Sequence, residues 1–210
     1  MMACLALEFS SARRSAAVAR DGLVLAEAFV LGGKATSAPS LIAEALGKAG
    51  LAPGDMGRLV VGVGPGSYTG IRRAIATFQG WSLAMGTPVA SVGSMELLAR
   101  LAHEALGGDC LLASDAQRGE WARGEMRGGR LAGPTRLVAR EELMAEMAGG
   151  RRVVTPDAGL DGAVVMYPTA ALAAAMGPGL AEVRPETLEA VYLREAAFIK
   201  APPPGRLAGS

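Results

Sequence analysis

Apolar residues near the start of the chain gather in short runs that are separated by small polar or glycine-containing turns. The runs at 3–7, 15–20 and 23–29 have the length of strands, and Asp21-Gly22 between the last two is a strong signal for a two-residue hairpin turn. Apolar spacing typical of helices follows at 37–50, 71–85 and 94–106. The chain is therefore predicted to open with a meander of strands and to continue with helices.

A continuous apolar run at 59–63 leads into the loop Gly64-Pro-Gly-Ser-Tyr-Thr-Gly70 and then into the second helix. Strand, tight turn and helix together aim several backbone amides at one place, and glycines beside a helix N-terminus suit a bound phosphate. The candidate nucleotide-binding residues come from this loop and from the first bend of the meander: Ser10, Gly64, Gly66, Ser67, Thr69 and Gly70.

The loop matches neither of the two common phosphate motifs. A P-loop requires Lys followed by Ser or Thr after its last glycine, whereas Ile71 and Arg72 follow Gly70. A dinucleotide fingerprint would have Ser67 or Thr69 where its third glycine belongs. The alternative is that the glycines only shape the turn and that Thr69 caps the helix.

The second helix has an unusual distribution of charge. Arg72 and Arg73 occupy its first turn, where cations oppose the helix dipole, so an acidic group is expected nearby. No charged residue follows between Ala74 and Met95. A helix that is apolar most of the way round is buried on more than one side, either inside a layered domain or against a partner. It is too short and too interrupted by glycine and proline to span a membrane.

The string from Gly64 to Arg72, the helix after it and residues 88–99 resemble the TsaB (YeaZ) family. Its members are the non-catalytic relatives of the enzyme that installs threonylcarbamoyladenosine in tRNA beside the anticodon. The resemblance implies an α/β fold of the actin-like ATPase (ASKHA, RNase H-like) class, with two subdomains of mixed sheets flanked by helices. The expected division is 1–106 for the N-terminal subdomain, 107–200 for a smaller C-terminal subdomain and 201–210 for a flexible tail.

In that family, the helix at 37–50 and the helix after Arg72 form the surface that packs against the catalytic paralogue or a second copy. By resemblance, the expected interface residues are Leu41, Ala45, Arg72, Ile75, Phe78, Gln79 and Ser82. The expected partners are a TsaD-like catalytic paralogue, a TsaE-like ATPase and, through the complex, tRNA; alone, the chain can form a homodimer. No cofactor is expected in the chain itself, although ATP or ADP can bind at the interface with the catalytic partner. The alternative is that both helices face only their own sheet.

Composition adds few constraints. The formal net charge of +1 and an aromatic content of 4% give no reason to expect a surface that binds nucleic acid by itself. The arginines between 123 and 152 are interleaved with glutamates, which predicts a solvated face of mixed charge. Cys4 and Cys110 lie in apolar runs and are predicted to be buried thiols in a reducing compartment. Without a signal-peptide core, a cytoplasmic location is expected.

Catalytic members of the superfamily would carry paired histidines for a metal ion, and His103 is the only histidine in the chain. We therefore predict a non-catalytic accessory subunit, without catalytic or metal-binding residues, that binds and activates the TsaD-type tRNA threonylcarbamoyl-transferase. The main alternative is a stand-alone ATP-dependent enzyme of the actin-like or sugar-kinase type, which would use Glu8, Ser10 and the loop at 64–70. A third interpretation is a peptidase, but the sequence shows neither a metal cluster nor a nucleophile–base pair for this activity.

Overall fold

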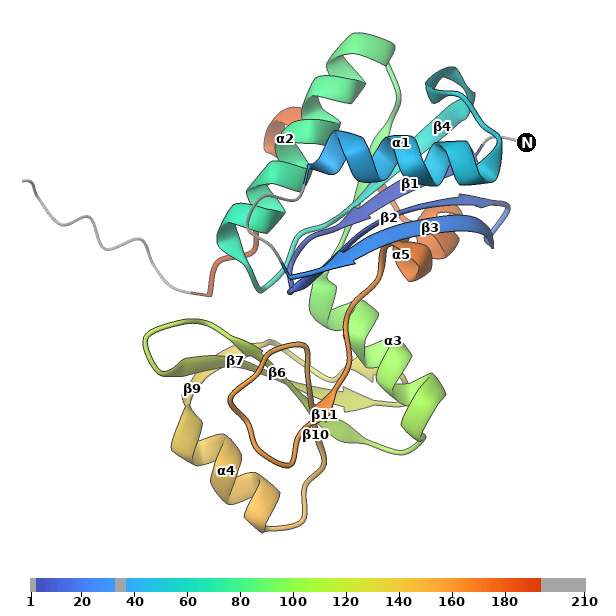
Figure 1. Ribbon diagram of the computed structural model, residues 1–210. Coiled ribbons are helices and arrows are strands. Elements are labelled where there is room, and N and C mark those ends of the chain that lie inside the picture. The colour runs from blue at the N-terminus through green and yellow to red at the C-terminus, as the bar shows by residue number, and fades with distance from the viewer. Residues whose placement is uncertain (1–2, 33–36, 194–210) are drawn as a thin grey trace, which may run out of the picture.

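The computed structural model describes residues 3–32 and 37–193 of the chain. Two sheets, each with helices on its faces, lie one above the other in Figure 1. The first sheet has the strand order β12-β5-β4-β1-β2-β3. Its strands are β1 (Ala3–Glu8), β2 (Arg13–Arg20), β3 (Leu23–Leu31), β4 (Met56–Gly62), β5 (Val89–Val92) and β12 (Glu182–Val183).

The first three strands form the predicted antiparallel meander, whereas β4 runs parallel to β1, and β5 runs parallel to β4. Strand β1 is buried along its whole length, because helices cover both faces of the sheet at this point. This explains why β1 and β4 are continuous apolar runs in the sequence. The outer strand β3 is covered less completely, and several of its side chains are exposed.

Helices α1 (Ala38–Ala49) and α2 (Tyr68–Met85) cover one face of the first sheet, and α5 (Ala170–Met176) covers the other (Figure 1). On the side of α1 and α2, Phe78 packs in one core with Leu5 and Leu59. On the side of α5, Cys4 and Val60 belong to a second core. Cys4 is only 5% exposed and packs in this core, as predicted, and burial raises the pKa of its thiol to about 12. Within the described ranges, none of the helices has both the length and the apolar character needed to cross a membrane.

The second sheet has the order β11-β10-β6-β7-β8, and β9 also pairs with β7. Its strands are β6 (Cys110–Asp115), β7 (Glu120–Arg127), β8 (Arg130–Leu131), β9 (Arg136–Ala139), β10 (Val153–Thr155) and β11 (Val164–Val165). Helix α3 (Ser94–Leu106) packs on one face, where Leu98 meets Leu112, and α4 (Arg140–Ala148) packs on the other, where Leu143 meets Leu111. These two mixed sheets flanked by helices confirm the predicted α/β architecture.

The C-terminal part of the chain corrects the predicted division at 107–200. After the second sheet, α5, β12 and the short 3-10 helices Gly177–Gly179 and Pro185–Thr187 return to the first sheet. Arg58 on β4 holds this return, since Nη1 donates to the carbonyl oxygens of Gly177 (2.9 Å) and Leu180 (2.6 Å), and Nη2 pairs with Glu182 (2.8 Å). Residues 170–191 therefore belong with the N-terminal subdomain, whereas Leu193 packs against the core of the second. A further 3-10 helix, Pro53–Asp55, precedes β4. The predicted tail at 201–210 lies outside the described residues.

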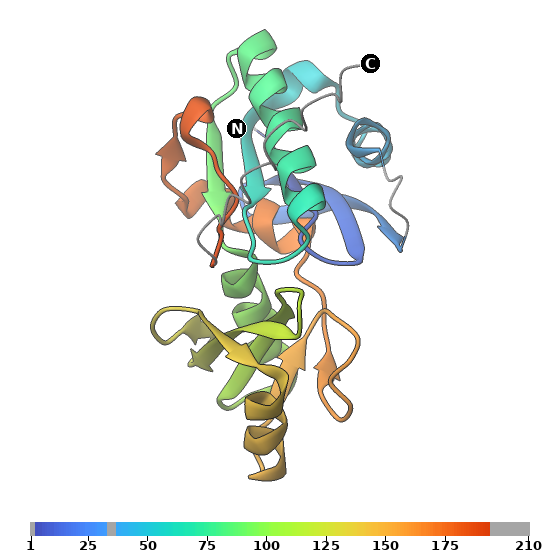
Figure 2. The ribbon, with the colours of Figure 1, turned by 90° about the vertical axis from the view of Figure 1, so that its left-hand side faces the viewer.

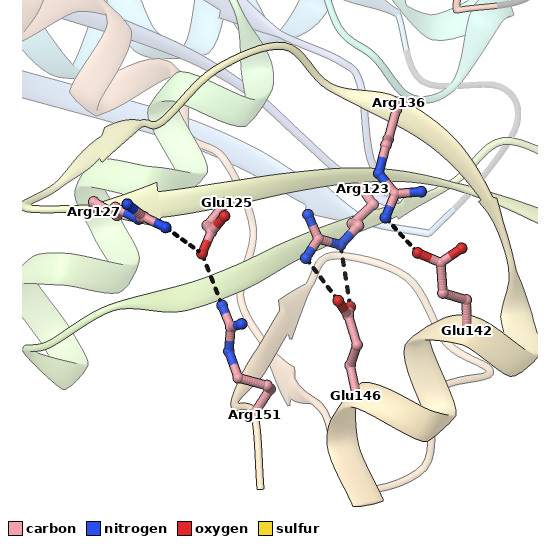
Figure 3. Close-up of polar contacts among 7 residues, drawn as sticks. All are labelled: Arg123, Glu125, Arg127, Arg136, Glu142, Glu146 and Arg151. Atoms are coloured by element: carbon pink, nitrogen blue, oxygen red, sulfur yellow. Dashed lines mark hydrogen bonds and ion pairs between the residues drawn. The ribbon is translucent and has the colours of Figure 1, made fainter. Parts of the chain in front are cut away.

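The outer surface of the second subdomain carries alternating charges that pair with one another (Figure 3). Nε and Nη2 of Arg123 donate to the two carboxylate oxygens of Glu146, over 3.1 and 2.7 Å. Glu125 accepts from Arg127 (3.2 Å) and Arg151 (3.0 Å). The arginines therefore form a face of mixed charge, as the interleaved glutamates predict, but Arg123 and Glu146 are mostly buried, with side chains 13% and 24% exposed.

Candidate partner surface and interdomain cleft

The glycine-rich loop connects β4 to α2 and lies against the bend between β1 and β2. The Ser67 amide donates to the carbonyl oxygen of Ser10 over 2.6 Å. A Cβ atom on Gly66 would lie 2.3 Å from that oxygen, and one on Gly70 would lie 2.1 Å from the carbonyl oxygen of Phe9. No side chain fits at such distances, so these glycines let the loop pack directly on the bend.

Two of the amides proposed to hold a phosphate already have partners within the chain. The Gly64 amide donates to Oγ of Ser94 (3.0 Å), and the Ser94 amide donates back to the Gly64 carbonyl oxygen (2.8 Å). The Ser67 amide is bonded to Ser10, as above. Ser67 occupies the N-cap position of α2, so the expected cap at Thr69 is wrong, and Thr69 lies inside the first turn. The structure thus brings the six candidates together around the bend. However, the amides of Gly64 and Ser67 already donate hydrogen bonds within the chain and are not available to a phosphate.

The side chain of Glu8 is fully buried beneath this loop. Its Oε1 accepts from the Ser10 amide (2.7 Å) and its Oε2 accepts from Oγ of Ser94 (2.9 Å). A Cβ atom on Gly62 would lie only 1.8 Å from Oε2. Burial raises the pKa of the Glu8 carboxyl, and the hydrogen bonds from Ser10 and Ser94 oppose that rise. This carboxyl ties β1, the bend and the start of α3 together, and it does not face solvent.

A cleft of about 510 Å³ lies between the two subdomains. Ser10, Tyr68 and Asp157 are among the residues that line it, together with the C-terminal segment at 190–193. Oδ2 of Asp157 accepts from Oγ of Ser114 (3.0 Å) and from the Asp115 amide (2.8 Å), and burial raises the pKa of the Asp157 carboxyl. The volume suits a small molecule.

Two of the loop amides are not available to a phosphate group in this cleft. The loop amides that would cradle the phosphates include those already bonded to Ser94 and Ser10. Within residues 3–32 and 37–193, no group of three or more His, Cys, Asp or Glu residues could hold a metal ion.

Four of the residues expected at a partner interface are buried inside the chain itself. Leu41, Ala45, Ile75 and Phe78 are exposed by 6%, 0%, 5% and 0%, and all pack in the core between the helices and the first sheet. These side chains cannot form the exposed surface predicted for them. On this point, the alternative that the apolar stripes face their own sheet is the better description.

The other three expected interface residues lie closer to solvent. Gln79 is half-buried, because its Nε2 donates to the carbonyl oxygen of Pro185 (2.8 Å) in the returning C-terminal segment. Ser82 is also half-buried, and Arg72 is exposed. Nη1 of Arg72 donates to the hydroxyl of Tyr68 (2.7 Å), so the neighbour that accompanies this cation is a phenol rather than the expected acid.

We use the term outer face of α2 for the side of the helix that points away from the sheet. Its exposed residues are Tyr68, Thr69, Arg72, Ala76, Gly80, Leu83 and Ala84. Leu83 is 90% exposed. Beyond Arg73 the helix has no charge to keep this face hydrated. The uncharged run in the sequence was the signal for this surface, but the run alone did not distinguish the outer residues from the inner ones.

Two sheets, a cleft between them and a glycine-rich loop at the first bend define a protein of the actin-like fold class. A component of (R)-2-hydroxyglutaryl-CoA dehydratase from Acidaminococcus fermentans shares this fold, with a TM-score of 0.50 at 13% identity over 84% of this chain and 98% of that chain. YeaZ from Pseudomonas aeruginosa is much more similar, with a TM-score of 0.73 at 27% identity over 92% of this chain and 100% of that chain. The predicted actin-like fold is confirmed.

The sequence defines the family more narrowly. The family model described as TsaD, tRNA N6-adenosine threonylcarbamoyltransferase, matches residues 35–149, and the chain belongs to this family. The uncharacterized protein Rv3421c of Mycobacterium tuberculosis is 33% identical over 126 residues, which are 57% of each chain. The tRNA threonylcarbamoyladenosine biosynthesis protein TsaB of Bacillus subtilis is 30% identical over 47% of this chain and 44% of its own. The resemblance to TsaB (YeaZ) is therefore confirmed, although the chain aligns with only about half of these curated relatives.

Proposed function

We propose that this protein is an accessory subunit in the formation of threonylcarbamoyladenosine in tRNA. In this role it binds and activates a catalytic transferase of the TsaD type and performs no chemistry itself. The observation that carries the proposal is the outer face of α2, which is exposed and, beyond Arg73, uncharged from Ala74 onward. Contiguous exposed apolar surface on a protein commonly marks a protein interface.

The outer face of α2 also suits the close approach of another helix. Ala76, Gly80 and Ala84 follow one another at intervals of four residues, so they lie near one line on the helix surface. No atom lies within 4 Å of a Cβ built on Gly80, so a neighbouring backbone has room there. Leu83 beside this line supplies an apolar side chain that is almost fully exposed until a partner covers it. Family membership and the TsaB relative indicate which partner to test first.

The stand-alone ATP-dependent enzyme is the less favoured function. Its phosphate loop would need amides that Gly64 and Ser67 use within the chain, and its acidic group, Glu8, is buried under the loop. The actin-like fold is the reason to consider this alternative, but the contacts of the loop do not support it.

The proposal is tested by measuring the mass of complexes in solution. The purified chain, the TsaD-type transferase of the same organism and their mixture are examined by light scattering after size-exclusion chromatography, with and without ATP. We expect a complex of the two chains and transferase activity that rises when this chain is added. A chain that neither binds nor activates the transferase, or that hydrolyses ATP alone at enzymatic rates, would contradict the proposal. A TsaE-like ATPase and a homodimer of the free chain are tested in the same format.

A further inference from the structure

A second exposed apolar surface lies on the opposite edge of the first sheet from β12. Of the eleven large apolar side chains exposed among the described residues, five are on β3: Leu23, Val24, Leu25, Phe29 and Leu31, with exposed fractions of 39–70%. We call these five residues, which are distributed over both faces of β3, the edge patch. Among the described strands, β3 pairs only with β2 and ends the strand order, and in Figure 2 it forms the outer margin of the sheet below α1. Surface of this kind on an edge strand invites pairing with another chain.

The charges that usually protect an edge strand are neutralised here. Glu27 is the only charged residue of β3, and its carboxylate pairs with Arg13 at 2.8 Å. The same guanidinium lies over the ring of Phe29, 4.1 Å from its centroid. No lysine or proline interrupts the strand between Leu23 and Leu31. The ion pair therefore covers part of the edge patch without giving the strand a net charge of its own.

One backbone acceptor of β3 already has a donor from the neighbouring helix, so an added strand would have to displace it. Nζ of Lys48, from α1, donates to the carbonyl oxygen of Glu27 over 3.3 Å, and this lysine side chain is itself 52% exposed. A register shift between Val18 and Ala19 of β2 interrupts the pairing near the hairpin. Beyond it, Ala26–Leu31 pair regularly with β2, and six residues of strand span roughly 20 Å. This length equals a typical strand in a sheet.

The pairing of β3 with β2 shows which side chains lie on each face of the sheet at this edge. Phe29 lies opposite Ser15, whose Oγ accepts from the Ala170 amide at the start of α5, so Phe29 is on the α5 side of the sheet. Leu31, two residues further, is on the same side. The other side is flanked by α1, where Glu44 and Lys48 form an ion pair. In an added strand, every second side chain would therefore lie beside Phe29 and Leu31, and the side chains between them would lie beside the ion pair of α1.

We infer that β3 is a docking edge for an extended segment of another polypeptide, about six residues long, in which apolar and polar side chains alternate. Such a segment would add a strand to the sheet by backbone hydrogen bonds and lay its apolar side chains on Phe29 and Leu31. A second copy of the chain is a poor occupant, because stable dimers bury about 20–30 residues on each side and β3 has only 9 residues. The inference does not depend on α2, which packs near the other half of the sheet.

The test uses random octapeptides displayed on phage and selected against the full chain, followed by affinity measurement with synthetic copies of the enriched sequences. We expect enriched peptides with alternating apolar residues, slower amide hydrogen exchange at 26–31 when they bind, and at least tenfold weaker binding to the Leu31→Lys variant. Leu83→Lys, the same substitution at an exposed leucine on the outer face of α2, is the matched control and should bind these peptides like the unaltered chain.

Three results would overturn the inference: no sequence enriched above a counter-selection on Leu31→Lys, protection of amides elsewhere than β3, or dimers of the unaltered chain that Leu31→Lys abolishes. Because Leu31 is 61% exposed, its replacement should leave the melting temperature unchanged, and Phe29→Lys provides a second variant if it does not. Binding of the TsaD-type transferase by Leu31→Lys should be normal. A failure of the docking edge is thus distinguishable from a failure of the proposed function.

Discussion

The inner and outer faces of α2 both lack charged residues beyond Arg73, but their environments are opposite. Ile71, Ala74, Ile75 and Phe78 face the first sheet and are buried. Ala76, Gly80 and Leu83, on the other side of the same helix, are exposed. Composition therefore does not separate a residue that maintains the fold from one that is available to a partner. The two faces should differ in what a substitution changes: the free energy of unfolding on the inner face, and association on the outer face.

The largest effect on stability is expected from Phe78→Ala. Removing a fully buried phenylalanine leaves a cavity and costs about 3–5 kcal/mol of unfolding free energy. Urea denaturation measures this change directly. Leu83→Ala, on the outer face, is the control and should change stability by less than about 0.5 kcal/mol. Similar losses for both variants would show that the outer face is also packed within the chain.

A pair of glycine substitutions in the same helix should have opposite signs. Gly70→Ala places a methyl group 2.1 Å from the Phe9 carbonyl oxygen, and relieving that overlap should cost about 1–3 kcal/mol. Gly80→Ala meets no atom within 4 Å and replaces glycine in a helix, so it should stabilise the protein by about 0.5–1 kcal/mol. Thermal unfolding of the two variants gives the comparison. Equal changes would mean that the loop does not pack on the bend as described.

The carboxyl beneath the loop gives the inner region a dependence on pH. Because the pKa of Glu8 is raised in the folded protein above its ordinary value of 4.5, the folded state holds this proton more tightly than the unfolded state. The contribution of Glu8 is therefore full below about pH 4.5 and is lost as the pH rises through the pKa of the folded state. The slope is at most about 1.4 kcal/mol per pH unit.

Glu8→Gln isolates this contribution from those of other titrating groups. The amide stays neutral, so the stability of the variant relative to the unaltered chain should improve as the pH rises from 4.5, as measured by urea denaturation at several pH values. A relative stability that falls with rising pH would mean that Glu8 is stabilised as a carboxylate.

The smallest effect on the free energy of unfolding is expected from an exposed ion pair. Arg136 and Glu142 form an exposed ion pair in the second subdomain, with side chains 52% and 42% exposed (Figure 3). Arg136→Ala should cost no more than about 0.2–1 kcal/mol, and addition of salt should reduce that cost. Calorimetry at two salt concentrations measures it. A loss of several kcal/mol would indicate that this ion pair is part of the packed structure and not simply solvated.

Much of the fold follows from local sequence. The Asp21-Gly22 hairpin, the strand before Gly64 and the helices α1, α2 and α3 lie close to their predicted positions because turn residues and apolar periodicity determine them locally. The return of residues 170–191 to the first sheet could not be predicted in this way. It depends on Arg58 bonding to carbonyl groups more than a hundred residues away in the chain, and on a strand of only two residues.

The candidate site was predicted less well, for a physical reason. A helix without charges is compatible with several orientations, so Ile75 and Phe78 were placed outward when the sheet in fact buries them. The loop motif lies where the sequence predicts it. However, glycine is required both where a phosphate approaches the backbone and where another part of the chain does, so the sequence alone does not separate these two cases. Only the contact of Gly66 with Ser10, and of Gly70 with Phe9, distinguishes these roles.

The most direct test of the account is the affinity of the TsaD-type transferase for Leu83→Lys, measured by titration calorimetry. Val165→Lys, another exposed apolar position at 55%, is the control in the second subdomain. Because burying a leucine contributes about 1.5–3 kcal/mol, Leu83→Lys should weaken binding at least about tenfold while its melting temperature stays unchanged. Normal affinity of Leu83→Lys, or an equal loss for Val165→Lys, would contradict the claim that the outer face of α2 binds the partner.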